Sequence, residues 1–250
     1  MVVRFFALLA LLTLWTGSAA AQDANDAPTS EEEVSAFVEN NLLHILYHEA
    51  AHAVIDQFGL PVLGQEEDAA DAFATVEILN SYEEADALAI LADSAIALFI
   101  MDERLGDDIE IADYYAIHDL DVQRGFRIIC HAVGLDPDTF GGLADEFELS
   151  EERAETCEDD GWLAADSWDV LLEPTFLPQD VVSERVSVDI DIETLTDTQR
   201  TNLMTSGVMD DFVAYLSETF DWPQPLTVTV DALRVSQGFD VDIDGNTLRH

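Results

Sequence analysis

Residues 42–58, LLHILYHEAAHAVIDQF, constrain the fold more than any other part of the chain. Their apolar side chains recur at a mixed spacing of three and four, and no Pro or Gly occurs before Gly59, so this stretch predicts a helix. On a helix, residues four apart share one face, which places the imidazoles of His48 and His52 side by side. Two imidazoles at that spacing can share one zinc ion, although an ordinary helix with two surface histidines would give the same pattern.

A second predicted helix, which begins near residue 65, would complete such a site. A catalytic zinc needs a third protein ligand, and Glu67 and Asp71 lie four residues apart, so both can face the first helix. We assign Glu67 as the third ligand and Asp71 as the carboxylate that accepts the remaining N–H of a ligand histidine. Glu49 directly follows the first histidine, where it can act as a general base without binding the metal. The alternative is that residues 66–71 are only the solvated acidic start of a helix.

These two segments resemble the gluzincins, which are zinc peptidases whose third ligand is a Glu on the helix that follows the two histidines. The matching motifs in this chain are His48-Glu49-x-x-His52 and Glu67-x-x-Ala70-Asp71. Residues 47–75 are more closely similar to a family of secreted bacterial proteins catalogued as zinc metallopeptidases. The resemblance implies a zincin-like helical catalytic region, one zinc ion and a peptide or protein substrate. It covers roughly residues 30–174, including residues 118–130, residues 153–157 and Ser167-Trp168.

Residues 82–105 and 109–133 also show helical apolar spacing, and the second of these segments carries His118. A peptidase needs a donor that stabilises the developing oxyanion beside the metal. The donors available in this segment are His118, Tyr114, Tyr115 and Arg124. We favour His118 for this role, partly because the resembling family carries His at the matching place. The alternative is that His118 caps or packs against a neighbouring helix. Arg124 lies among acidic residues and is expected to form a structural ion pair.

The charge of the chain restricts its partners. The 250 residues include 53 acidic and nine basic ones, all of them Arg, so the net charge is −44. Such a surface repels nucleic acids and anionic membranes, and we exclude both as partners. The hydrophobic fraction of 48% still permits a normal globular core. The negative field could draw basic peptides to the site, or it could reflect only a host or compartment that selects acidic surfaces.

Residues 1–21 have the features of a secretory signal peptide, with Arg4, an apolar run over residues 5–15 and small residues up to Ala21. That run is too short for a membrane span, which needs roughly 20 residues, and no later stretch predicts one. We expect cleavage near Ala21, a disordered linker over residues 22–29, and export to the periplasm or the exterior.

The chain has two cysteines, Cys130 and Cys157. Because an exported chain meets an oxidising compartment, we expect them to form one disulfide. A zinc-binding role is not expected for them, because the set of histidine and glutamate ligands is complete without thiolates.

Composition changes at residues 173–179, where two prolines mark a boundary. Beyond it, residues 197–220 have helical spacing, and three segments alternate apolar with polar residues as half-buried strands do. These segments are residues 186–193, 226–231 and 239–244. We therefore predict an α+β fold, with a helical metallopeptidase-like domain at residues 30–178 and a small α+β region at residues 179–250 that could line the cleft.

The sequence as a whole predicts a secreted zinc-dependent metallopeptidase with Glu49 as its general base. Two alternatives stay open: a zinc-stabilised binding protein without turnover, and an acidic extracytoplasmic interaction domain without a metal. The sequence specifies neither the cleavage preference nor the oligomeric state.

Overall fold

The computed structural model describes residues 30–105, 111, 113–190, 195–232 and 239–244. This part of the chain is mainly helical and carries one small sheet, which confirms the α+β class. The elements in chain order are α1 (Glu31–Phe58), α2 (Glu66–Ser81), α3 (Glu84–Leu105), η2 (Asp113–Tyr115), α4 (Asp121–Leu135), α5 (Pro137–Glu146), α6 (Glu151–Leu172), η3 (Glu173–Thr175), β1 (Val186–Ile190), α7 (Asp197–Ser206), α8 (Val208–Thr219), β2 (Leu226–Ala232) and β3 (Phe239–Asp244).

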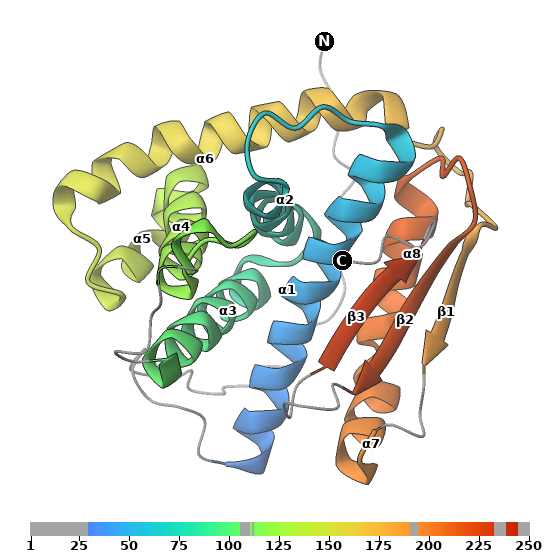
Figure 1. Ribbon diagram of the computed structural model, residues 1–250, viewed down its shortest axis with the longest axis horizontal. Coiled ribbons are helices and arrows are strands. Elements are labelled where there is room, and N and C mark those ends of the chain that lie inside the picture. Colours follow the sequence, from blue (N-terminus) through green and yellow to red (C-terminus); the bar gives the residue numbers. More distant parts are fainter. Residues whose placement is uncertain (1–29, 106–110, 112, 191–194, 233–238, 245–250) are drawn as a thin grey trace, which may run out of the picture.

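Helix α1 is the central element of the fold. It runs through the middle of the molecule, between helices α2–α6 on one side and the sheet with α7 and α8 on the other (Figure 1). Its first turn is closed by a capping box, in which Ser30 accepts from the backbone N–H of Glu33 and Glu33 accepts from that of Ser30. Its last turn ends at Gly59, whose φ of 63° is the left-handed conformation that glycine adopts without strain. The end of the helix at Gly59 agrees with the prediction from the sequence.

Helices α4 and α6 approach each other closely, because a glycine lies at their contact. A Cβ atom at Gly134 would lie 1.9 Å from the carbonyl oxygen of Cys157, so no larger residue fits without a shift of the backbone. The disulfide between Cys130 and Cys157 joins the same two helices, as the sequence predicts. Helix α6 is also fixed to α2, because the indole N–H of Trp168 donates to the carbonyl oxygen of Ala69 at 3.2 Å.

The C-terminal elements pack against the far side of α1. Strand β2 is the middle strand of the sheet, parallel to β1 and antiparallel to β3. The centroid of the Tyr47 ring on α1 lies 5.4 Å from the ring centroid of Phe212 and 4.8 Å from that of Tyr215, and both of these residues are on α8. The hydroxyl of Tyr215 donates to Glu77 on α2 at 2.7 Å. Buried side chains of both regions form one continuous cluster, and the domain boundary at residues 178–179 stays a prediction.

Two predicted helices differ from the structure. The helix predicted over residues 197–220 is divided into α7 and α8 by Gly207, which has a φ of 81°. The helix predicted over residues 109–133 is wrong in its first part, because Asp113–Tyr115 form a 3-10 turn and α4 begins only at Asp121. The apolar residues that suggested an earlier start, among them Tyr114 and Ile117, are exposed and face no core.

Other predictions concern segments outside the described residues. They include the signal peptide, the linker and the end of the first predicted strand at residues 191–193. In the part of the chain that the structure describes, no helix has the length and apolar character needed to cross a membrane.

Candidate metal centre

The side chains of His48, His52 and Glu67 converge where α1 and α2 meet. The Nε2 atom of His48 lies 3.2 Å from the Nε2 atom of His52. The Oε2 atom of Glu67 lies 3.1 Å from the first of these nitrogens and 3.4 Å from the second. Tetrahedral zinc with ligands at about 2.0–2.1 Å places neighbouring ligand atoms about 3.3–3.4 Å apart. The three donor atoms therefore fit one metal ion, and they are the single such group among the described residues.

Both imidazoles contact carboxylates of α2 through their Nδ1 atoms, on the side of the ring away from the proposed metal. The Nδ1 atom of His48 lies 2.8 Å from Oδ1 of Asp71, and the Nδ1 atom of His52 lies 2.7 Å from Oε1 of Glu66. These contacts fix each ring so that its Nε2 atom faces Glu67. Asp71 thus contacts a proposed ligand histidine, and its assigned role stays a proposal. The sequence does not predict the contact of Glu66 with His52. The one feature of the sequence that could have indicated this contact is the second acidic residue, directly before Glu67.

Asp71 is itself held by Arg124 of α4. The guanidinium donates from Nε to Oδ2 at 2.8 Å and from a terminal nitrogen to Oδ1 at 2.9 Å, which is a two-pronged contact. Burial alone would raise the pKa of Asp71, but Arg124 and His48 lower it far below its ordinary value. A chain of contacts thus leads from α4 through a buried, ionised carboxylate to the imidazole of His48.

The charges of the cluster also shift the pKa values of the proposed ligands. Burial would lower the pKa of His48, but its contacts with Asp71 and Glu67 raise it to about 9. Burial would raise the pKa of Glu67, but the hydrogen bond with His48 and the nearby charges of His52 and His118 lower it to about 2. Glu67 is therefore ionised at neutral pH, as a metal ligand must be.

The two predicted catalytic residues lie next to this group. Glu49 is partly exposed on α1, directly after His48. His118 lies in the loop before α4, and its Nε2 atom lies 2.7 Å from Oε2 of Glu67. The imidazole of His118 is 42% exposed, so it is open to a ligand from solvent. The contact with Glu67 brings His118 to the candidate centre. Glu49 is placed only by its position next to His48 on α1, and both roles stay proposals.

Comparison with known proteins agrees with this geometry. The model of a family described as "Putative metallopeptidase" matches residues 12–172, which is more than half of the chain. The chain belongs to this family. Neither the curated proteins nor the solved structures include a match. The matched residues include α1 and α2, which carry His48, His52 and Glu67. The match ends at Leu172, the last residue of α6.

Proposed function

We propose that this member of the metallopeptidase family is an exported, zinc-dependent peptidase of zincin-like architecture. The observation that supports the proposal most directly is the triangle of donor atoms from His48, His52 and Glu67, with sides of 3.1–3.4 Å. Two imidazoles and one carboxylate form a ligand set that suits zinc in hydrolytic enzymes and leaves a fourth position for water or substrate.

Residues His48, His52 and Glu67 would hold the ion, and Asp71 and Glu66 keep the imidazoles oriented toward it. Zinc, when bound, supplies a Lewis acid that polarises the peptide carbonyl and lowers the pKa of water to about 7. Glu49 takes a proton from the attacking water and passes it to the leaving amine as the peptide bond breaks. His118 donates a hydrogen bond to the negative charge that develops on the peptide oxygen.

Export is supported by the disulfide between Cys130 and Cys157, because such bonds persist in oxidising compartments. We infer that the chain is released near Ala21 and acts in the periplasm or outside the cell. Mass spectrometry of protein recovered from a secreting host tests this. A chain retained at full length with two free thiols contradicts it.

The function is tested by metal analysis followed by digestion of a broad peptide library. We expect one zinc per chain, cleavage by the loaded protein, and loss of cleavage when a chelator removes the metal. The Glu49→Gln variant should retain zinc and lose at least about 100-fold in rate, because only the proton transfer is removed. Zinc without cleavage would instead favour a zinc-stabilised binding protein. A purified chain that binds no metal would contradict the whole proposal.

A further inference from the structure

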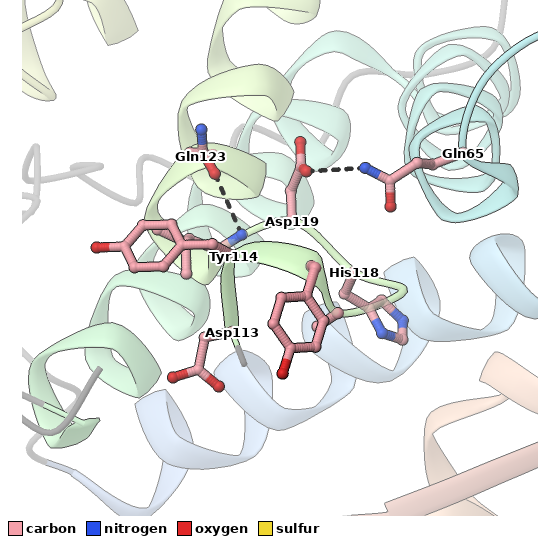
Figure 2. Close-up of a pocket in the computed structure, with 9 residues that line it drawn as sticks. Gln65, Asp113, Tyr114, His118, Asp119 and Gln123 are labelled. Carbon is pink, nitrogen blue, oxygen red and sulfur yellow. Dashed lines mark hydrogen bonds between the residues drawn. The ribbon is translucent and has the colours of Figure 1, made fainter. Parts of the chain in front are cut away.

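His118 reaches the candidate centre from a loop that apolar packing does little to hold. This loop before α4 borders a polar pocket of about 440 Å³, which opens between it and Gln65 at the start of α2 (Figure 2). Tyr114, Tyr115 and Ile117 are 67%, 75% and 62% exposed, so they bury little apolar surface. Because burial of apolar side chains fixes most segments of a fold, polar contacts must determine where this loop lies.

The carboxylate of Asp119, the residue after His118, makes such contacts through both of its oxygens. The side-chain amide of Gln65 donates to Oδ1 at 3.1 Å, a contact that Figure 2 shows. Arg127 on α4 donates to Oδ2 at 2.6 Å. The loop is therefore joined to the start of α2 on one side and to α4 on the other.

Arg127 extends these contacts into a network. Its other terminal nitrogen donates to Oδ1 of Asp68 on α2 at 2.6 Å. Burial would lower the pKa of Arg127, but Asp119 and Asp68 raise it. A single exposed ion pair contributes little, but here one guanidinium bridges two carboxylates, and the three side chains are only 24–34% exposed. The network is thus suited to fixing the geometry of the loop.

The network and the candidate centre meet in the first turn of α2. Glu67, the proposed ligand, lies in the sequence between Gln65 and Asp68, which both belong to the network. Glu67 itself lies 2.7 Å from Nε2 of His118. The start of α2 therefore contacts two successive residues of the loop, His118 through the ligand and Asp119 through Gln65.

We propose that Asp119 is a positioning residue, which holds His118 where its ring can donate to the oxyanion of the substrate. The inference rests on the proposed function, because it takes His118 to be the oxyanion donor. Such a donor must lie about 2.7–3.1 Å from the developing charge. A misplacement of about 1 Å can cost on the order of 100-fold in rate. Asp119 acts through the residue before it and takes no part in proton transfer.

The test compares two ligands of the zinc-loaded protein, in which Glu49→Gln prevents turnover. One is a peptide that the library digestion identifies as a substrate, and the other is the same peptide with a phosphonamidate in place of the scissile amide. The phosphonamidate has the tetrahedral shape and the negative oxygen of the intermediate, so its binding depends on the oxyanion donor. We expect Asp119→Asn to weaken binding of the phosphonamidate about tenfold and that of the peptide less than about twofold, as measured by calorimetry.

A double-mutant cycle with His118→Ala shows whether Asp119 acts through His118. Without the donor, Asp119→Asn should change the affinity for the phosphonamidate by less than about twofold. A loss of about tenfold that persists without His118 would make the role of Asp119 merely structural and would overturn the proposal. An unchanged affinity when Asp119→Asn is made alone would overturn it as well.

Asp166→Asn, at an exposed position of α6, removes the same charge and is the matched control. It should leave both affinities unchanged, and an equal loss in this variant would overturn the proposal. Zinc affinity separates displacement of His118 from general disruption of the centre. Asp119→Asn should leave it unchanged, because the carboxylate contacts Gln65 and Arg127. Zinc binding that weakens as much as phosphonamidate binding would overturn the proposal.

The position of His118 is also measured without metal or substrate. The centroids of the His118 and His48 rings lie 6.3 Å apart, so protein with isotope-labelled histidine should show a nuclear Overhauser contact between these rings. We expect Asp119→Asn to abolish this contact and Asp166→Asn to keep it. A contact that survives in Asp119→Asn overturns the proposal, even if the wild type cleaves peptides. A contact that is lost, in a protein whose zinc-loaded wild type cleaves no peptide, contradicts the peptidase and leaves the positioning by Asp119 in place.

Discussion

Arg124 shows how a residue that touches no proposed ligand can still control the candidate centre. Its guanidinium contacts both oxygens of Asp71, and Asp71 contacts Nδ1 of His48. The orientation and the basicity of the His48 imidazole therefore depend on a residue of α4. The sequence predicts only that Arg124 forms an ion pair, because the identity of its partner depends on how α4 packs against α2.

We predict that Arg124→Gln weakens zinc binding about 10- to 100-fold, because Asp71 loses the contacts that hold it against His48. Competition with a chromogenic chelator measures the affinity. Arg127→Gln is the matched control, since it removes the same charge from the same helix but contacts Asp68 and Asp119 instead. Equal weakening in both variants would show that the effect is one of charge and not of position.

His131 on α4 is a buried histidine, with 7% of its surface exposed. Burial lowers its pKa to about 4, and Arg127 and Arg153 act in the same direction. The neutral form is therefore favoured by folding. The stability that it contributes is complete above its unfolded pKa of about 6.5 and is lost as the pH falls from there to about 4.

We expect His131→Gln to remove this dependence. Between pH 7 and pH 4.5, the free energy of unfolding of the metal-free protein should fall by about 2 kcal/mol more in the wild type than in the variant. Urea denaturation at both pH values measures the difference. Parallel pH profiles of the two proteins would contradict the prediction.

At the scale of elements, the glycine at the contact of α4 and α6 gives a sharp test of the packing. Gly134→Ala should lower the free energy of unfolding by about 1–3 kcal/mol, because the added Cβ meets the backbone of Cys157. Gly142→Ala on α5 is the matched control, since nothing lies within 4 Å of its added Cβ. There the same change should raise stability by about 0.5–1 kcal/mol. A stabilised Gly134→Ala protein would contradict the described contact.

Elements whose ends are determined by local chemistry could be predicted from the sequence. Helix α1 is one, because Ser30 and Glu33 close its start and Gly59 ends it. The convergence of His48, His52 and Glu67 was also predictable, because spacings of four define a helix face and a second acidic helix follows. Whether Glu66 would reach His52 depends on the rotation of α2 against α1, which no local pattern specifies.

The structure of the loop before α4 could not be predicted from the sequence, for a related reason. Apolar spacing indicates a helix only where the apolar side chains become buried, and Tyr114, Tyr115 and Ile117 are exposed. The residues that made the sequence look helical are the ones that line or border the pocket beside the centre.

At the scale of the whole molecule, the net charge of −44 dominates the response to salt. Repulsion among like charges destabilises the compact state, and salt screens it. We predict that the melting temperature of the zinc-loaded protein rises between 0.02 M and 0.5 M sodium chloride, as measured by scanning calorimetry. Sucrose at equal osmolality serves as the uncharged control. A melting temperature that stays constant or falls in salt would show that ion pairs outweigh the repulsion.

The cross-link between Cys130 and Cys157 lies between two supports of α2. Helix α4 holds α2 through Arg124, and helix α6 holds it through Trp168. The bond therefore reinforces the packing of the two helices that contact α2, which carries Glu67.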